Sequence, residues 1–340
     1  MKAAVFNRVG EPFEIQDRPD PTPGEDQVVI KVGRCGICGS DLHMTEKEGM
    51  GCPPSGTVMG HEISGEVVEI GRSVTNLKPG DLVAALPIIG CGKCAGCLAG
   101  EPSYCEQGLR FLAGGYAEYA IAGARECLTI PKGLTLDDGA LVEPLAVALH
   151  GLRSVHGIAE SKVMVLGAGP IGLGAVYWAH RFGATRIEVI EGNPDRARMA
   201  MQLGASCVRS PDLESNPLAV MPDRNGPDFV FECVGRPGLL AAAISLVKPR
   251  GSVVSLGFCV APEQILAAAA AMREVRLVFP QLYSLDDYRV TLEAFEAGHV
   301  EPRLMLTGKT GLRDLPKVFE ALREPGAHCK VMLDPSLDQV

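Results

Sequence analysis

One strand–turn–helix–strand stretch in the middle of the chain constrains the fold more than any other feature. Residues 162–166 are almost continuously apolar, as expected for a strand buried on both faces of a parallel sheet. A turn with the sequence GAGPIG follows at 167–172, then a helical pattern over 173–182 and an apolar strand over 187–190 that ends at Glu191. Glycines at this spacing between a strand and a helix are typical of a dinucleotide-binding unit. The sequence therefore predicts an α/β fold with a doubly wound parallel sheet.

Each glycine of this turn has its own physical role in such a unit. Gly167 permits the tight turn, Gly169 lets a pyrophosphate approach the backbone, and Gly172 lets the helix pack closely on the strand. Pro170 and Ile171 open the helix, whose first N–H groups and positive dipole end favour phosphate. We therefore expect all five residues to form the cofactor-binding turn.

The acidic residue at the end of the second strand bears on which dinucleotide is bound. The Glu191 carboxylate can accept hydrogen bonds from a ribose 2′-hydroxyl and would repel a 2′-phosphate, so NAD is favoured over NADP. Arg196 lies close enough in sequence to accommodate a 2′-phosphate instead. Strict selectivity for NAD therefore stays open at this point.

Strands and helices continue to alternate after this unit. Further strands are expected near residues 206–208, 228–231, 252–256 and 275–278, with helical stretches between them. This alternation predicts a parallel sheet with right-handed crossovers. It stops near residue 283 and leaves a helix near 285–297 and a last strand near 330–333. We expect this tail to return to the first domain.

The N-terminal part of the chain has a different character. Residues 1–34 alternate apolar and polar side chains between Pro and Gly turns, and residues 63–71 alternate again, as strands of a half-buried sheet do. A convincing helical pattern first appears over residues 137–157. The chain therefore opens with a β-rich domain.

Four closely spaced cysteines interrupt this domain. They follow the pattern C-x2-C-x2-C-x7-C, which suits a closed tetrahedral zinc site. Neighbouring glycines allow the short loop to wrap around an ion. The sequence therefore predicts a structural zinc held by Cys91, Cys94, Cys97 and Cys105.

A second set of potential ligands lies earlier in the chain. Cys38, His61 and Glu62 supply a thiolate, an imidazole and a carboxylate, which can hold Zn²⁺ and leave a fourth position open for catalysis. Glu143 lies in an apolar run, where a carboxylate is costly to bury unless it is paired, protonated or bound to a cation. On these grounds Glu143 is either a metal ligand or a carboxylate near a helix N-terminus.

Composition excludes several classes of function. The chain of 340 residues has a formal net charge of -9 and no basic run, so neither nucleic acid nor an anionic membrane is an expected partner. No apolar run approaches the roughly 20 residues that span a membrane, and no signal-peptide core follows Met1. We therefore expect a cytoplasmic protein, in which the remaining cysteines stay reduced.

Taken together, the motifs resemble the zinc-dependent medium-chain alcohol dehydrogenases, in particular the branch of sorbitol, threonine and butanediol dehydrogenases. The resemblance rests on CGICGSDLH at 35–43, GHE at 60–62, the four-cysteine lobe, EPL at 143–145 and GAGPIG at 167–172. It implies a GroES-like catalytic domain formed by residues 1–148 and 283–340, with a Rossmann NAD-binding domain at 149–282. It also implies two zinc ions per subunit and a homotetramer or homodimer.

Residue by residue, the resemblance assigns the catalytic zinc to Cys38, His61 and Glu62, while relatives differ over whether Glu62, Glu143 or both touch the metal. Ser40 and His43 match proton-relay positions, although both could simply make loop hydrogen bonds. Contacts to the nicotinamide half of the cofactor fall on Leu256, Gly257, Phe258, Gln281 and Leu282.

The resemblance also implies a mechanism. Zinc lowers the pKa of the alcohol and so favours the alkoxide, the relay carries the proton to solvent, and hydride passes reversibly to NAD⁺ to give a ketone.

The substrate pocket departs from the pattern of sorbitol dehydrogenases. Leu282 stands where they carry Arg and Met44 where they carry Tyr, while Phe111 and Leu112 lie in the segment that closes the pocket in relatives. A polyol would leave hydroxyls unpaired there, at a cost of about 1–3 kcal/mol each. We therefore expect an apolar secondary alcohol or its ketone, such as a bulky or alicyclic one. The alternative is a polyol or diol.

Two other classes of function compete with this hypothesis. A zinc-free quinone or enoyl reductase could share the two-domain plan, but it would need neither Cys38 nor the cysteine lobe. A non-enzymatic protein that binds zinc and a nucleotide is also compatible with the motifs, but it would leave the open metal position unexplained.

Overall fold

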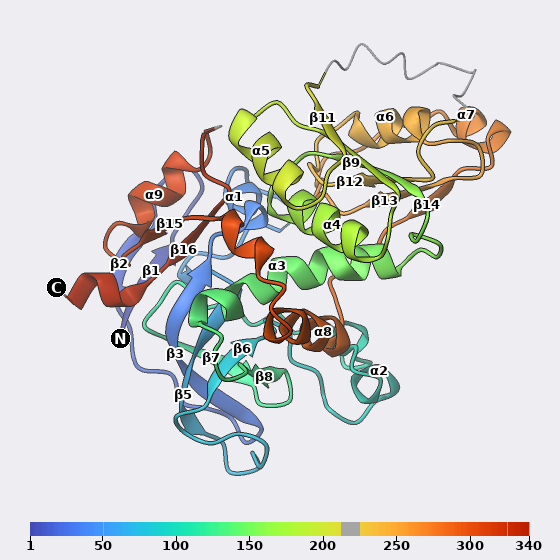
Figure 1. Cartoon of the computed structure of the whole chain (residues 1–340). Coiled ribbons are helices and arrows are strands. Elements are labelled where there is room, and N and C mark those ends of the chain that lie inside the picture. The colour runs from blue at the N-terminus through green and yellow to red at the C-terminus, as the bar shows by residue number, and fades with distance from the viewer. Residues whose placement is uncertain (50, 212–224, 325, 340) are drawn as a thin grey trace. The chain divides into compact units, whose positions relative to one another are not determined.

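The computed structural model describes residues 1–49, 51–211, 225–324 and 326–339. The chain divides into two compact units, one formed by Met1–Glu143 with Tyr283–Val340 and the other by Pro144–Leu282 (Figure 1). The first unit is rich in β-structure and the second contains a parallel sheet. The predicted fold class is therefore confirmed.

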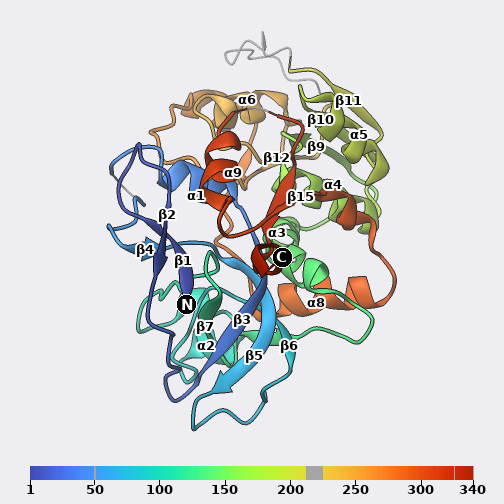
Figure 2. The same ribbon diagram turned by 90° about the vertical axis from the view of Figure 1, so that its left-hand side faces the viewer.

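The first unit contains two β-sheets. The smaller sheet has the strand order β2-β1-β4, and the larger has the order β15-β16-β3-β5-β6-β8, with β7 also paired to β3. The long strands β3 and β5 run side by side and antiparallel (Figure 2). The strands are β1 Lys2–Phe6, β2 Glu14–Asp17, β3 Gln27–Gly36, β4 Thr57–Val58, β5 Glu62–Ile70, β6 Leu82–Ala85, β7 Tyr119–Gly123, β8 Cys127–Thr129, β15 Leu306–Thr310 and β16 Lys330–Leu333.

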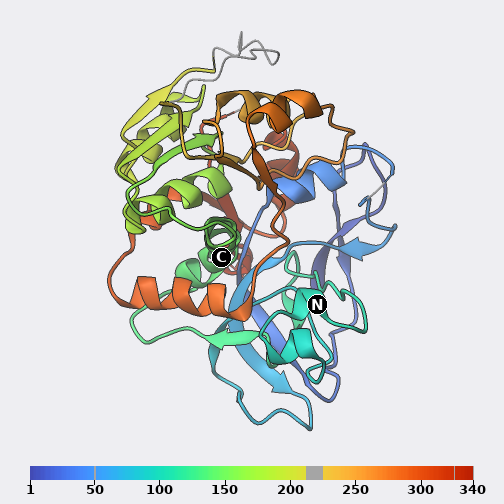
Figure 3. The ribbon, with the colours of Figure 1, turned by 90° about the vertical axis from the view of Figure 1, so that its right-hand side faces the viewer.

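Helices of the first unit are mostly short. They are α1 Gly39–Met44, α2 Ala95–Leu98, α8 Leu285–Glu296, α9 Leu315–Ala321 and the 3₁₀ turns Pro102–Tyr104, Glu301–Met305 and Pro335–Gln339. The Leu285 N–H donates to the Gly100 carbonyl at 2.8 Å, so α8 begins against the loop that follows α2 (Figures 1 and 3). The sequence patterns missed β15 and α9, which are short and lack a clear period.

The end of the chain contributes a strand to the larger sheet of the first unit. Met332 and Leu333 of β16 pair antiparallel with Gly36 and Cys35 of β3. This pairing brings Lys330, at the start of β16, next to the segment that follows β3, where Cys38 lies.

Helix α3, Leu136–Arg153, is the first long helix of the chain, and the boundary between the units falls within it. The Asp138 carboxylate accepts hydrogen bonds from the N–H and the hydroxyl of Thr135 at 2.7 and 2.8 Å. Arg303 donates to both oxygens of the same carboxylate. These contacts fix the start of the helix that carries Glu143.

The second unit is a six-stranded parallel sheet with the order β11-β10-β9-β12-β13-β14. From the central strand β9 the chain adds β10 and β11 on one side, and it then returns to add β12, β13 and β14 on the other side. Because the crossovers are right-handed, this reversal places α4 and α5 on one face of the sheet and α6 and α7 on the other (Figure 1). The elements are β9 Lys162–Leu166, α4 Pro170–Arg181, β10 Arg186–Ile190, α5 Pro194–Gln202, β11 Cys207–Arg209, β12 Phe229–Glu232, α6 Leu239–Leu246, β13 Ser252–Ser255, α7 Ala267–Met272 and β14 Arg276–Val278.

The predicted elements of this unit agree with the structure to within a few residues. Strand β9 has the predicted bounds, whereas α4 starts three residues before the predicted residue 173. The earlier start has a local cause, because Gly169 caps the helix and Pro170 occupies its first position, where no N–H is needed. No helix in the described part of the chain is long and apolar enough to cross a membrane.

Candidate functional site

The first unit brings together the three residues predicted to hold the catalytic metal. Cys38 follows β3 and caps the N-terminus of α1, while His61 and Glu62 lie at the beginning of β5. One potential ligand atom from each of Cys38, His61 and Glu62 lies within 4.8 Å of the other two. Two neighbouring strands of one sheet, β3 and β5, thus position the group.

The Glu62 carboxylate provides a direct test of whether a cation fits here. Its Oε1 accepts a hydrogen bond from Lys330 Nζ at 2.6 Å, and both side chains are fully buried. Its Oε2 is also buried but has no hydrogen-bond partner among the described residues. A buried carboxylate oxygen without a donor is unfavourable. A zinc ion bound by thiolate, imidazole and carboxylate would satisfy it, so the residues fit the metal.

A carboxylate behind His61 orients its ring. Asp41 Oδ1 lies 3.3 Å from His61 Nδ1, and both side chains are buried. Burial alone would lower the pKa of His61, but the Asp41 carboxylate facing it holds that pKa well above its usual value. A carboxylate bonded to one ring nitrogen leaves the other nitrogen directed at the metal position.

The two residues at the predicted relay positions lie on α1 but have different surroundings. The Ser40 hydroxyl donates to Cys38 Sγ at 3.3 Å, so it lies directly beside the metal group. His43 is more exposed, and its Nδ1 lies 3.8 Å from Glu46 Oε2.

Glu143 lies outside the group formed by Cys38, His61 and Glu62. It is buried on α3, and burial raises its pKa to about 7. The hydroxyl of Tyr283, at the start of the returning segment, is close enough to influence that pKa. The geometry therefore favours Glu62 as the third ligand and leaves Glu143 as a neighbouring acid.

The four-cysteine lobe forms the second potential metal centre. One sulfur from each of Cys91, Cys94, Cys97 and Cys105 lies within 4.8 Å of the others. Backbone amides that donate to Cys91 lower its pKa to about 6, whereas burial raises the pKa of Cys97 to about 12. A bound cation would keep all four sulfurs deprotonated together, so the lobe also fits zinc.

Cys97→Ser should destabilise this lobe. Structural zinc contributes folding free energy directly. We expect the bound zinc to fall by one ion per chain and the melting temperature to fall by about 4–8 °C, equivalent to about 2 kcal/mol. Metal analysis and calorimetry check this, with Cys207→Ser on strand β11 of the second unit as the matched control. Full zinc content in Cys97→Ser would contradict the assignment.

The glycine turn of the second unit has the geometry that a dinucleotide requires. Gly167 follows β9 in the left-handed region, with φ of 87°. A Cβ on Gly172 would lie 1.8 Å from the Gly167 carbonyl oxygen, so position 172 in the first turn of α4 requires glycine. No atom would lie within 4 Å of a Cβ on Gly169, which leaves open space at the helix N-terminus. This local geometry is compatible with the three predicted roles, which stay predictions.

Glu191, which follows strand β10, contacts the backbone of the glycine turn. Its Oε2 accepts from the Ala168 N–H at 2.8 Å and its Oε1 from the Asn193 N–H at 2.7 Å. Arg196 Nη2 lies 3.3 Å from Glu191 Oε1, so the guanidinium is paired with this carboxylate.

The residues predicted to contact the nicotinamide follow β13 and β14. The N–H groups of Leu256 and Gly257 both donate to the Glu232 carbonyl, whereas Phe258 is half exposed. Gln281 is exposed, and Leu282, the last residue of the second unit, adopts a left-handed φ of 55°. A left-handed leucine is uncommon and marks a locally strained backbone.

Of the predicted substrate-pocket residues in the first unit, Phe111 has the clearest relation to the metal group. Its ring lies 5.7 Å from the His61 ring, edge to face, and it is 44% exposed. Leu112 is half-buried and its N–H donates to the Pro87 carbonyl at 2.7 Å, while Met44 packs against the core at the end of α1.

The structure adds functional residues that the sequence patterns did not single out. Asp41 stood within the CGICGSDLH motif but had no assigned role, and Lys330 comes from the far end of the chain. No local signal could identify Lys330, because its contact with Glu62 depends on strand β16 joining β3.

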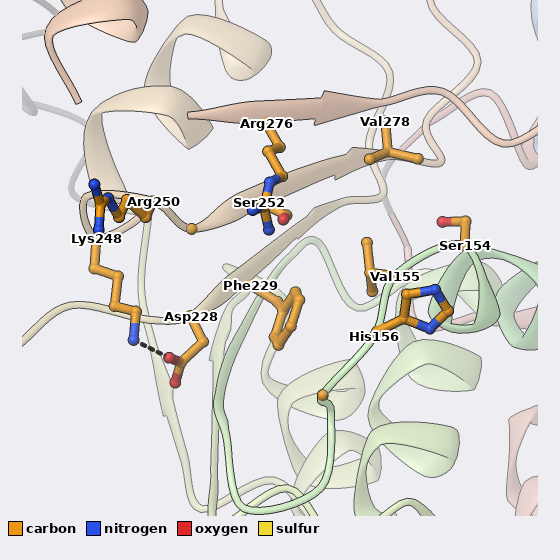
Figure 4. Close-up of a pocket in the computed structure, with 12 residues that line it drawn as sticks. Ser154, Val155, His156, Asp228, Phe229, Lys248, Arg250, Ser252, Arg276 and Val278 are labelled. Atoms are coloured by element: carbon orange, nitrogen blue, oxygen red, sulfur yellow. Dashed lines mark ion pairs between the residues drawn. The ribbon is translucent and has the colours of Figure 1, made fainter. Parts of the chain in front are cut away.

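A cavity of about 460 Å³ opens at the amino ends of the second unit's strands β12, β13 and β14 (Figure 4). Its cations are largely neutralised, because Lys248 pairs with Asp228 and Arg250 pairs with Glu274. The glycine turn follows the opposite, carboxyl end of β9, and no predicted site residue lines this cavity.

The chain matches two protein-family models. The alcohol dehydrogenase GroES-like domain matches residues 24–132, and the zinc-binding dehydrogenase family matches residues 170–297. Families of this kind use zinc together with NAD or NADP, in agreement with both sites described above.

Relatives of known structure or function cover nearly the whole chain. Sorbitol dehydrogenase from Bacillus subtilis is 31% identical, with 99% of this chain and 98% of the relative covered. The crystal structure of 2R,3R-butanediol dehydrogenase from the same species is 30% identical, with a TM-score of 0.84 and 98% and 99% covered. A zinc-binding dehydrogenase from Sinorhizobium meliloti, solved with NADP, has a TM-score of 0.86 at 30% identity, with 98% and 99% covered.

The family models, the relatives and the two metal-binding groups lead to one assignment. The chain belongs to the zinc-dependent medium-chain alcohol dehydrogenases, enzymes that act on alcohol groups.

Proposed function

We propose that this dehydrogenase oxidises a secondary hydroxyl of a polyol or diol to a ketone, reversibly, with NAD⁺ as hydride acceptor. The observation that carries the proposal is the group of Cys38, His61 and Glu62, in which the buried Glu62 Oε2 lacks a hydrogen-bond partner among the described residues. The names of its relatives, sorbitol and butanediol dehydrogenase, support the substrate class. These names favour a polyol or diol, the alternative raised from the sequence, over an apolar secondary alcohol as the substrate.

In this proposal the first unit holds the metal and handles the proton. Cys38, His61 and Glu62 bind the zinc ion, which acts as a Lewis acid on the substrate hydroxyl when bound. Ser40, whose hydroxyl lies beside Cys38 Sγ, would accept the substrate proton while releasing its own, and the more exposed His43 would pass that released proton to solvent. The alcohol loses a proton and a hydride, and NAD⁺ becomes NADH.

The second unit would bind the cofactor. The start of α4 supplies unpaired N–H groups to the pyrophosphate, and Glu191 accepts hydrogen bonds from the ribose of the adenosine half. Leu256, Gly257, Phe258, Gln281 and Leu282 are proposed to contact the nicotinamide half. This division of roles follows the predicted domains, 1–148 with 283–340 for catalysis and 149–282 for NAD.

Glu143 and Tyr283 support a hydroxylated substrate. Glu143 is a buried acid outside the metal group, and the buried Tyr283 hydroxyl has no hydrogen-bond partner among the described residues. A polyol carries a second hydroxyl that needs such partners when it is buried. An apolar ketone would leave both groups unused.

The second candidate is an apolar secondary alcohol, favoured by the ring of Phe111 against His61. Met44 and Leu112 add further apolar surface, and Leu282 replaces a donor at the end of the second unit. Apolar side chains bind an alkyl or cyclic substituent well and offer a polyol no hydrogen bonds.

A substrate panel tests both candidates. NADH formation would be followed at fixed NAD⁺ with sorbitol, xylitol, 2,3-butanediol, 2-butanol and cyclohexanol. The proposal predicts the highest kcat/KM for a polyol or the diol, at least 10-fold above the matched mono-alcohols. The opposite order would favour the apolar candidate, and turnover that survives removal of zinc by a chelator would refute the proposed site.

Glu191→Gln should weaken the preference for NAD. The wild-type carboxylate would repel a 2′-phosphate and engages Arg196, whereas the amide carries no charge and frees the guanidinium. One hydrogen bond to a charged group contributes about 1.5–3 kcal/mol, so we expect the NAD/NADP ratio of kcat/KM to fall about 10-fold or more.

Initial rates with the two cofactors measure the ratio. Glu188→Gln on the preceding strand β10 is the control, since Glu188 pairs with Arg186 and Arg209. Equal use of NAD and NADP by the wild type would contradict this assignment of Glu191.

We further propose that the chain assembles as a homotetramer or homodimer in the cytoplasm. Strand β14 lies at the edge of the parallel sheet, and next to it Phe279 is 63% and Met272 74% exposed, which favours pairing with another copy. No disulfide links the described cysteines, and both metal groups need reduced sulfur, in keeping with a reducing compartment. Light scattering at several protein concentrations tests the assembly.

A further inference from the structure

One side chain behind the metal group has no role in the proposed chemistry and yet is fully buried with its polar atom paired. The Tyr116 hydroxyl donates to Asp41 Oδ2 at 2.5 Å, and the Tyr116 side chain has no solvent exposure. The other oxygen of the same carboxylate faces His61. Tyr116 is therefore two contacts away from His61, a proposed metal ligand.

The ring of Tyr116 is held rigidly from several sides. It packs edge to face against Phe13 and Phe319, with ring centroids 6.0 and 6.3 Å away. Its own N–H donates to the Met59 carbonyl at 2.9 Å. A Cβ on Gly60, the residue before His61, would lie 2.5 Å from the ring. The hydroxyl is thus presented to Asp41 from a fixed position in the core.

Asp41 in turn contacts two of the three proposed ligands, Cys38 and His61. Its Oδ2 also accepts from the Cys38 N–H, but at the long distance of 3.3 Å, and its Oδ1 lies 3.3 Å from His61 Nδ1. The Tyr116 hydroxyl makes the shortest of these three contacts. If it were absent, the carboxylate could rotate away from His61, because only the long amide contact would hold Oδ2.

We propose that Tyr116 is a positioning residue for the metal centre, whose hydroxyl locks Asp41 so that His61 directs its free nitrogen at the zinc ion. The inference rests on the proposed function, because it takes the group of Cys38, His61 and Glu62 as the catalytic metal site. Mutation of a carboxylate that accepts a hydrogen bond from a metal-bound histidine typically lowers metal affinity or activity 10- to 100-fold. Tyr116 would hold the carboxylate that in turn orients His61.

Tyr116→Phe is the direct test, because it removes a single oxygen and keeps the ring that packs on Phe13 and Phe319. Zinc release to a chromogenic chelator would be followed over time, with the catalytic ion assigned as the phase missing in Cys38→Ser. We expect that phase to be about 10-fold faster and kcat about 10-fold lower, with the KM for NAD⁺ unchanged. Tyr119→Phe, on the same segment, is the control.

A double variant tests whether Tyr116 acts through Asp41. In the Asp41→Asn background, Tyr116→Phe should accelerate zinc release less than twofold further, since the carboxylate it holds is already gone. Release at the wild-type rate in Tyr116→Phe, or an undiminished effect in the double variant, would overturn the inference. Failure of the proposed function is distinguishable, because Cys38→Ser would then lose no zinc-release phase.

Discussion

Cys38→Ser should abolish most of the activity while the protein remains folded. A serine hydroxyl is a far poorer zinc ligand than a thiolate, so only His61 and Glu62 would remain of the grouped ligands. We expect kcat to fall at least 1,000-fold, which corresponds to about 4 kcal/mol of lost transition-state stabilisation. Bound zinc should fall by one ion per chain, with the other ion remaining in the cysteine lobe. Initial rates and metal analysis on the same preparation measure both quantities.

The control for this prediction is Cys207→Ser, which changes a half-buried cysteine on the edge strand β11 of the other unit. Its rate and zinc content should match the wild type. Circular dichroism should show the same secondary structure for all three proteins, because Cys38 lies in a loop between β3 and α1. Full turnover in Cys38→Ser would mean that zinc at this group does not carry the reaction.

The parts of the fold that the sequence predicted are those specified by local patterns. The strand over 162–166, the glycine turn and Glu191 form a contiguous unit, in which each residue contacts others close in sequence, such as Gly172 against Gly167. Apolar runs of four to five residues marked the parallel strands because those strands are buried on both faces. The cysteine lobe was equally local, since one loop carries all four sulfurs.

The sequence could not specify contacts between distant segments. The motifs CGICGSDLH and GHE suggested the metal group, but residues that support it come from elsewhere in the chain. The Tyr116 hydroxyl donates to Asp41, and Lys330 Nζ donates to Glu62. Glu143 shows the same limit. Its apolar surroundings indicated a buried acid, but only the arrangement of α3 relative to β3 and β5 leaves it outside the group of Cys38, His61 and Glu62.

Lys330→Met should destabilise the first unit strongly. Lys330 and Glu62 form a fully buried ion pair, in which Lys330 Nζ also donates to the Ile37 carbonyl at 3.1 Å. Methionine keeps most of the volume but leaves the Glu62 carboxylate buried without its cation. Removing one partner of a buried pair typically costs about 3–5 kcal/mol of the free energy of unfolding. Urea unfolding of chelator-treated protein measures this cost in the absence of metal.

Two comparisons separate the loss of the pair from a general effect of mutation. Lys309→Met removes a more exposed pair with Asp137 and should cost no more than about 1 kcal/mol. The double variant Lys330→Met/Glu62→Gln removes the unpaired charge and should recover much of the stability lost in Lys330→Met. Bound zinc should also reduce the loss of stability in Lys330→Met, because the cation would neutralise the Glu62 carboxylate in place of the lysine. If Lys330→Met costs no more than Lys309→Met in metal-free protein, the buried pair does not stabilise the first unit.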